Sequence, residues 1–130
     1  MYLTDTSIWI DLFNSKATPL TIQKFNNNEL CLTSLVYFEI FQGIKTPKLH
    51  KKIQNILLQQ TFYYLHDELN SYEQAAEIYR KCRQNGITPR STIDCLIVQC
   101  AIENNLILLH NDRDFSKIAE VYPLLKEQKI

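Results

Sequence analysis

The sequence predicts an α/β fold in which helices cover both faces of a central, mainly parallel sheet of four or five strands. Strand-like and helix-like segments alternate along the 130 residues, which favours parallel strands joined by helices. The segment LILLH (106–110) is continuously apolar, as expected of a strand buried on both faces. Hydrophobic residues make up 45% of the chain and charged residues 22%, an ordinary composition for one globular domain spanning residues 1–130.

The first half of the chain should supply two strands and four helices. A short strand at residues 2–3 leads into a helix whose apolar residues (8, 9, 12 and 13) recur with a helical period. A second helix begins at Thr18–Pro19 and ends at NNNEL. A strand in ELCLTS (29–34) precedes a helix that Thr33 or Ser34 caps and Gly43 ends. Thr46–Pro47 opens a fourth helix, which runs to about residue 59.

The second half should supply three strands and three helices. TFYYL (61–65) is rich in aromatic residues and predicts a strand. The clearest helix spans 70–86, with Ser71 and Gln74 as a capping box and Gly86 as its end. A mostly apolar helix at 91–105 precedes the strand LILLH, and NDRDFSKIAE turns into a short helix. VYPLL (121–125) is expected to be a final edge strand, because Pro123 is tolerated only at an edge.

Composition excludes several classes of function. Lys and Arg (14) balance Asp and Glu (14), so any nucleic-acid binding must rest on a local patch. Two glycines are too few for Gly-rich phosphate loops. The four cysteines form no CxxC pair and the three histidines lie far apart, so no zinc site is indicated. Apolar surroundings for Cys95 and Cys100, and the lack of a signal peptide or membrane span, predict a cytoplasmic protein.

Several acidic residues lie where an ordinary surface carboxylate would not. Asp5 stands between a strand and a helix, a position that suits a helix cap or a ligand site at the sheet's carboxyl edge. Glu39 shares its helix face with Leu35 and Val36. Burying its carboxylate there would be costly unless a Lys or Arg pairs with it. Asp94 has Ile97 and Val98 one turn on, although a first-turn charge favoured by the helix dipole is an alternative.

Two further acids, Asp112 and Asp114, directly follow the buried strand LILLH, where either could also serve as a turn or cap residue. Groups beyond the carboxyl ends of parallel strands converge on one crevice, so these acids are expected to meet Asp5, Glu39 and Asp94 there. Carboxylates so close would repel one another unless a cation neutralised them, and oxygen donors without Cys or His suit Mg²⁺ or Mn²⁺. One or two ions could be held. Thr6 or Ser7 could hydrogen-bond Asp5 or a metal-bound water.

A divalent ion among carboxylates has a use in phosphodiester hydrolysis, because it lowers the pKa of water and stabilises charge on the phosphoryl oxygens. A polyanionic substrate would need nearby cations, and two groups are available: the lysines at 45, 48, 51 and 52, and Arg80, Lys81, Arg83 and Arg90. Either group could instead be a solvated surface. The candidates for steering such a phosphate backbone are Lys45, Lys48, Arg90 and Arg113.

The same segments resemble one known family. LTDTSIWIDLF (3–13), TSLVYFEIFQGI (33–44) and RSTIDCLIVQCAIENNLILLHNDRDF (90–115) look like the PIN-domain ribonucleases, and most closely the VapC toxins of bacterial toxin–antitoxin pairs. The resemblance spans nearly the whole chain, with the acidic motifs in the right order. It implies a three-layer α/β/α fold, an endoribonuclease dependent on Mg²⁺ or Mn²⁺, a homodimer, and a cognate VapB-like antitoxin that blocks the catalytic groove.

The resemblance also implies roles for individual residues. Asp5 matches the family's first acid, Glu39 the second and Asp94 the third. The fourth acid is Asp112 or Asp114, with Asp112 preferred. Thr6 matches the small hydroxyl residue that follows the first acid, so Asp5, Glu39, Asp94 and Asp112 become the expected metal ligands.

Three other readings are kept open. A phosphorylatable receiver domain would also place carboxylates at strand ends, with Asp67 as phosphoacceptor, but its acid pair and late Lys are missing. A PIN-like module could bind a partner without catalysis. A DNA nuclease of similar architecture would carry the same acids, and the sequence hardly separates it from a ribonuclease. The aromatics at 37, 38, 41, 63 and 64 are expected in the core or a dimer contact rather than as base-stacking surfaces.

Overall fold

The computed structural model describes all 130 residues, which form one five-stranded sheet and seven helices. The strands are β1 (Tyr2–Thr4), β2 (Leu30–Leu32), β3 (Thr61–Phe62), β4 (Ile107–His110) and β5 (Lys126–Lys129). The helices are α1 (Thr6–Phe13), α2 (Pro19–Asn26), α3 (Ser34–Gln42), α4 (Pro47–Leu57), α5 (Glu68–Gln84), α6 (Thr92–Glu103) and α7 (Arg113–Val121). None of these helices has the length and hydropathy needed to cross a membrane.

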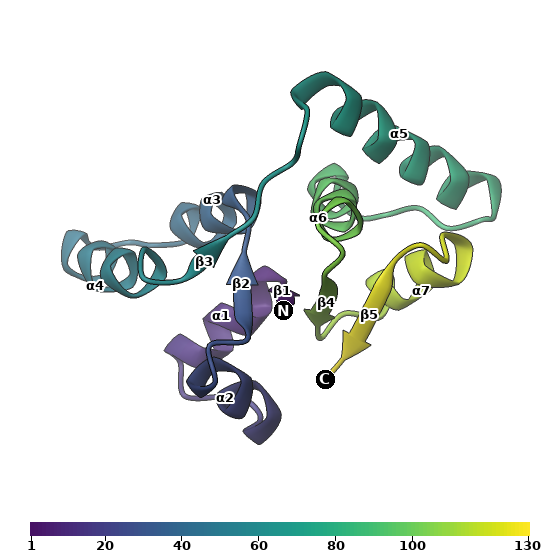
Figure 1. Cartoon of the computed structure of the whole chain (residues 1–130). Helices are drawn as coiled ribbons and strands as arrows, with labels where there is room; N and C mark the ends of the chain where they lie inside the picture. Colours follow the sequence, from purple (N-terminus) through teal and green to yellow (C-terminus); the bar gives the residue numbers. More distant parts are fainter.

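The strand order is β3-β2-β1-β4-β5 and every pair is parallel, which confirms the predicted three-layer α/β/α class. The chain builds the sheet outward from β1 in one direction through β2 and β3, then returns to add β4 and β5 on the other side. Figure 1 shows α1 to α4 grouped beside β2 and β3, and α5 to α7 beside β4 and β5. The boundary between β1 and β4 is therefore the point where ligand sites form in open α/β sheets.

The centre of the sheet is also the centre of the core. Leu3, Leu32, Leu108 and Leu109 are fully buried, because strands covered by helices on both faces have no solvated side. Register between β1 and β4 pairs Thr4 with Leu109, and the pairing continues past the strand through a 3.0 Å hydrogen bond from the Asp5 N–H to the Leu109 carbonyl. The main chain of Asp5 is thus fixed to the end of β4.

Most of the predicted helix starts are confirmed. Thr18 and Thr46 each accept a hydrogen bond from the backbone three residues on, and a proline follows each, so α2 and α4 begin as expected. Thr33 takes the cap position of α3 without a side-chain bond, and α3 ends at Gly43 in an ordinary right-handed conformation. The stop at Gly43 therefore does not depend on glycine's access to positive φ.

The predicted capping box of α5 is wrong. The helix begins at Glu68, and Asp67 caps it by accepting the Asn70 N–H at 2.7 Å. Ser71 lies inside the helix, fully buried, where its hydroxyl donates to Glu103 Oε1 at 2.5 Å. The pattern failed because two possible cap residues, Asp67 and Ser71, stand four residues apart, and the acceptor that Ser71 uses, Glu103, lies 32 residues away in sequence.

The final strand is also not where the apolar pattern placed it. VYPLL contributes the end of α7 and a turn, and the edge strand is the polar segment Lys126–Lys129, paired in parallel with β4. An edge strand has one open side and tolerates charged side chains, so hydropathy does not mark it. Glu127 on this strand points back to β4 and contacts His110.

Glu103 at the end of α6 should be a major anchor for α5. Its carboxylate accepts from the Ser71 hydroxyl, from Gln99 Nε2 and from the His66 N–H. Burial alone would raise the pKa of Glu103, but these hydrogen bonds outweigh it and lower the pKa. Replacing Glu103 with Ala removes the acceptor of the hydrogen that the buried Ser71 hydroxyl donates, although Ser71 Oγ still accepts the Asp67 N–H at 3.2 Å. Loss of that acceptor costs about 1–3 kcal/mol.

We expect urea unfolding of Glu103→Ala at pH 7 to show that loss, and the exposed ion-pair variant Glu77→Ala to change stability by roughly 0–1 kcal/mol. The wild-type advantage over Glu103→Ala should shrink as pH falls through the lowered pKa of Glu103. Equal stabilities for the two variants would contradict the anchoring role.

Candidate active site

Asp5 is the N-cap residue of α1 by position, yet its side chain does not cap the helix. Its carboxylate instead accepts a 3.0 Å hydrogen bond from the Ser7 hydroxyl, as the sequence suggested for Thr6 or Ser7. It takes part in no ion pair. Of the two roles that the sequence left open for Asp5, the structure disfavours the cap and leaves a partly buried carboxylate at the carboxyl edge of β1.

Glu39 reaches the same edge from α3. No Lys or Arg pairs with it, so the alternative of a paired surface carboxylate does not hold. The Thr6 hydroxyl donates to Glu39 Oε1 at 2.7 Å across 33 residues of sequence. The two hydroxyls that follow Asp5 thus have different partners. Ser7 donates to Asp5, and Thr6 donates to Glu39 and so links α1 to α3.

Asp94 lies in the first turn of α6, whose cap is Ser91. Burial, followed by the charges of Asp5, Glu39 and Asp112, raises the pKa of Asp94 to about 7, while Arg90 opposes them. These three acids can act on Asp94 only from nearby, so four elements bring four carboxylates to one place. The uncompensated repulsion is the electrostatic condition that a bound cation relieves.

Asp112 caps α7, accepting the Asp114 N–H at 2.9 Å through Oδ1, while its Oδ2 contacts Nη2 of Arg90. Arg90 Nε lies 2.7 Å from Asp114 Oδ2. Of these two candidates for the fourth acid, only Asp112 is among the charges that raise the pKa of Asp94. Asp114 lies at the rim, where it shares the guanidinium.

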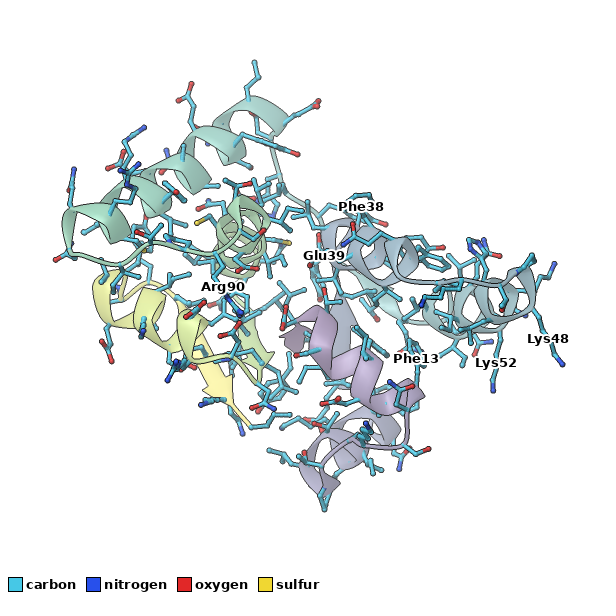
Figure 2. The ribbon with its side chains drawn as sticks, turned by 180° about the vertical axis from the view of Figure 1, so that it is seen from behind. Phe13, Phe38, Glu39, Lys48, Lys52 and Arg90 are labelled. Carbon is cyan, nitrogen blue, oxygen red and sulfur yellow. The ribbon has the colours of Figure 1, made fainter.

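The predicted cations are distributed unevenly. Arg90 contacts the acids although its side chain is 71% exposed, so water or a ligand can replace it there. Arg113, the first residue of α7, is exposed. Figure 2 places Arg90 and Glu39 near the middle of the molecule, while Lys48 and Lys52 project from the far end of α4. Lys45 is exposed in the loop before α4.

The donor set fits a hard divalent cation. Asp94 and the three acids around it are partly buried carboxylates with only Arg90 as a positive neighbour, and oxygen donors of this kind bind Mg²⁺ and Mn²⁺. Their present side-chain positions do not gather three ligands around one point. Thr6 holds Glu39 and Arg90 holds Asp112, so an ion would have to displace these hydrogen bonds by rotating the carboxylates.

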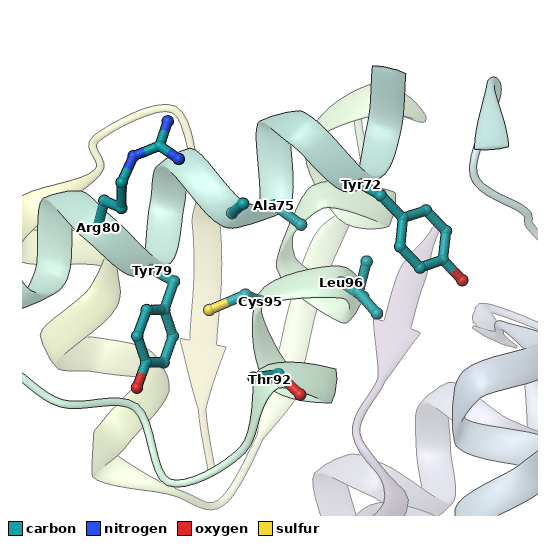
Figure 3. Close-up of a pocket in the computed structure, with 8 residues that line it drawn as sticks. Tyr72, Ala75, Tyr79, Arg80, Thr92, Cys95 and Leu96 are labelled. Atoms are coloured by element: carbon teal, nitrogen blue, oxygen red, sulfur yellow. The ribbon is translucent and has the colours of Figure 1, made fainter. Parts of the chain in front are cut away.

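A separate apolar cavity of about 400 Å³ lies between α5 and α6. Figure 3 shows Tyr72 and Tyr79 on α5 facing Thr92, Cys95 and Leu96 on α6. Successive helical residues are about 100° apart, so Asp94 points to the other side of α6. The cavity has no acid in its lining and is distinct from the carboxylate cluster.

Sequence reasoning missed His110 and Glu127. His110 is fully buried at the end of β4, one hydrogen bond from the main chain of Asp112, and Glu127 holds its other ring nitrogen. The sequence feature that could have indicated His110 is its place at the end of an otherwise apolar strand, directly before the acids. Its partner Glu127 could not be found, because the final strand was predicted at the wrong residues.

Comparison with known proteins agrees with this geometry. The model of the PIN domain matches residues 2–121, which is nearly the whole chain and includes all four acids. The chain belongs to the PIN-domain family. This confirms the resemblance seen in the sequence and excludes the receiver-domain alternative, in which Asp67 was the phosphoacceptor but in the structure caps α5.

Relatives and solved structures give the same answer. The chain is 28% identical over 126 residues to VapC ribonuclease Mb1587 of Mycobacterium bovis and to Ribonuclease VapC11 of Mycobacterium tuberculosis, covering 93% of each protein and 93% of this chain. Its fold matches VapBC2 from Rickettsia felis bound to a promoter DNA fragment, with a TM-score of 0.80 and 19% identity over 99% of this chain and 98% of that one. DNA-bound VapBC from Salmonella typhimurium gives 0.76, with 18% identity over 98% and 96%.

The raised pKa of Asp94 predicts a pH effect on this PIN domain. Because the folded pKa is about 7 and the ordinary value 3.8, Asp94 supports the metal-free fold fully below about pH 4, and that support is lost as pH rises through 7. Asp94→Asn should therefore melt higher than wild type at pH 8, by roughly 4–6 °C for a gain of about 1 kcal/mol, and about equally at pH 4.

Thermal melts in EDTA across that range measure the difference, with Glu120→Gln on the exposed face of α7 as the control that should follow wild type. Parallel curves for wild type and Asp94→Asn would contradict the crowding of charge around Asp94.

Proposed function

We propose that this PIN domain, comprising residues 1–130, is a metal-dependent endoribonuclease that acts as the toxin of a toxin–antitoxin pair. The observation that carries the proposal is the convergence of Asp5, Glu39 and Asp112 on the partly buried Asp94. Membership of the PIN family, and relatives named VapC ribonucleases over 93% of their length, support it. Mg²⁺ is the proposed cofactor, and Mn²⁺ is expected to substitute for it.

Four side chains would hold the cofactor: Asp5, Glu39, Asp94 and Asp112. When bound, a divalent ion supplies a lowered pKa for water and neutralises charge on the phosphoryl oxygens. Burial and the neighbouring acids raise the pKa of Asp94, so its ionisation depends on that positive charge. Thr6 holds Glu39 and Ser7 holds Asp5 at the carboxyl edge of the sheet until an ion binds.

Arg90 is the cation best placed for the substrate. Its guanidinium contacts Asp112 and Asp114 and is exposed, so it can turn to a phosphate of the RNA when the acids are neutralised. Arg113 and Asp114 stand beside it at the start of α7. Lys45 and Lys48 belong to a run, residues 40–66, that holds four lysines and no acid. They would contact RNA beyond the cleavage site.

The proposed partners are an RNA and a VapB-like antitoxin. VapBC complexes from Rickettsia felis and Salmonella typhimurium share the fold over 98–99% of this chain, which supports an antitoxin partner. A homodimer is proposed with it. We also propose a cytoplasmic location, in keeping with four buried cysteines that form no disulfide.

The cleavage test uses purified protein free of antitoxin, end-labelled structured RNAs, and Mg²⁺ or Mn²⁺. Wild type should cut at discrete sites, EDTA should stop cutting, and Asp94→Asn should lower the rate by at least about a hundredfold, because a carboxylate ligand is lost. The matched control is Glu120→Gln, which removes an exposed carboxylate of α7 and should leave the rate unchanged.

Cutting that survives Asp94→Asn would refute the assigned site. Metal binding without cutting of any RNA would favour the non-catalytic PIN-like module, and preferential cutting of a DNA strand of matched sequence would favour the DNA nuclease.

The lysine run predicts a selective effect on substrate binding. Lys45→Ala/Lys48→Ala should raise KM for RNA by about three- to tenfold at 150 mM salt and leave kcat unchanged, since neither lysine reaches the acids. The slope of log KM against log salt should fall by roughly 1–1.5. The double variant Lys16→Ala/Lys117→Ala removes two exposed lysines elsewhere and should match wild type; an equal effect in both would mean that only net charge matters.

A further inference from the structure

β4 ends in a histidine whose two ring nitrogens are both engaged. His110 is fully buried; its Nδ1 lies 3.1 Å from the backbone nitrogen of Asp112, and its Nε2 lies 2.6 Å from Glu127 Oε2. Phe115 of α7 packs against the imidazole, with ring centroids 5.2 Å apart. The ring is therefore held between the sheet and the helix that Asp112 caps.

These contacts select one tautomer. A backbone N–H can only donate, so Nδ1 of His110 must offer its lone pair to the Asp112 N–H. Nε2 then carries the hydrogen and donates it to Glu127. A carboxylate at one ring nitrogen fixes both the tautomer and the orientation of the imidazole, as it does for histidines that support metal sites.

Glu127 is itself fixed in place. It stands on β5, in register with Leu108 of β4, and its Oε2 also accepts from the Ser116 hydroxyl of α7 at 3.2 Å. The carboxylate thus joins β4, β5 and α7 at one point. Its side chain is 23% exposed, so a substitution there disturbs the core less than one at His110.

The adjacent residues Leu109 and His110 hold the main chains of two acids of the site. The Leu109 carbonyl accepts the Asp5 N–H at 3.0 Å, and the His110 ring accepts the Asp112 N–H. We propose that His110, oriented by Glu127, is a positioning residue that sets the backbone of Asp112 and so places its carboxylate near Asp94. This inference rests on the proposed function, because it takes Asp112 to be an acid of the catalytic site.

Two matched variants separate positioning from packing. In His110→Asn, the amide oxygen can occupy the place of Nδ1 and still accept the Asp112 N–H. In His110→Gln, the longer side chain places its amide near Nε2 and leaves that N–H without an acceptor. Both variants lose the ring that packs on Phe115, so they should be destabilised to similar extents.

The first measurement needs neither metal nor RNA. In ¹⁵N-labelled protein, the Asp112 amide hydrogen should exchange about tenfold faster in His110→Gln than in wild type, and within about threefold of wild type in His110→Asn. The ring ¹⁵N shifts of wild-type His110 should report hydrogen on Nε2. Hydrogen on Nδ1, or equal exchange in the two variants, would overturn the proposal.

The second measurement is Mn²⁺ affinity in the absence of RNA, followed by cleavage. His110→Gln should bind Mn²⁺ about 10–100-fold more weakly and lose kcat with KM unchanged, while His110→Asn stays within about threefold. If the His110 variants do not fold, Glu127→Leu replaces His110→Gln, and Glu127→Gln, which keeps an oxygen acceptor for Nε2, replaces His110→Asn.

The outcomes distinguish the two levels of the argument. An active wild type whose Mn²⁺ affinity and kcat are unchanged in folded His110→Gln and Glu127→Leu would overturn the positioning role alone. A wild type that neither binds Mn²⁺ nor cuts RNA would overturn the proposed function, and the positioning role with it.

Discussion

The parallel pairing of β1 with β4 is the contact on which the rest of the molecule depends. These strands meet at the place where the chain stops extending the sheet in one direction and returns to extend it in the other. Their buried leucines form the centre of the core, and the Asp5 N–H continues the ladder by bonding the Leu109 carbonyl. The same pairing places the turn with Asp112 beside Asp5. Stability and the candidate site therefore share one structural element.

The fold brings like charges together and compensates them only in part. Asp94 is partly buried, and its pKa is raised to about 7 by burial and by three neighbouring carboxylates. Arg90 is the one cation that opposes this, and it does so from an exposed position. Such a cluster lowers the stability of the metal-free protein, which proteins accept at functional sites and offset in the surrounding structure. Hydroxyls from Thr6 and Ser7, and the Glu127–His110 pair behind Asp112, are the ordered supports around it.

Sequence patterns were most reliable where the residue type has one physical meaning. The apolar strand LILLH, the Thr–Pro helix starts and the out-of-place Glu39 each allow few structures, and each was found where expected. Patterns failed where a residue has several possible partners. Ser71 fits the role of a helix cap as well as that of a buried hydrogen-bond donor. The segment Lys126–Lys129 is so polar that its composition does not indicate a strand. In the sequence Glu127 resembles an ordinary surface carboxylate, and only the structure shows that it contacts His110.

The sequence by itself determined the class of fold and the order of its elements, and it named the candidate acids, because periodicity and the positions of acids relative to strands are local properties. Tertiary structure decided which carboxylates meet. It disfavoured the cap role of Asp5, favoured Asp112 over Asp114 as the acid that acts on Asp94, placed Lys48 far from them, and joined His110 to Glu127. Those outcomes depend on register, crossing helices and side-chain direction, which contacts between distant segments set and which no local pattern contains.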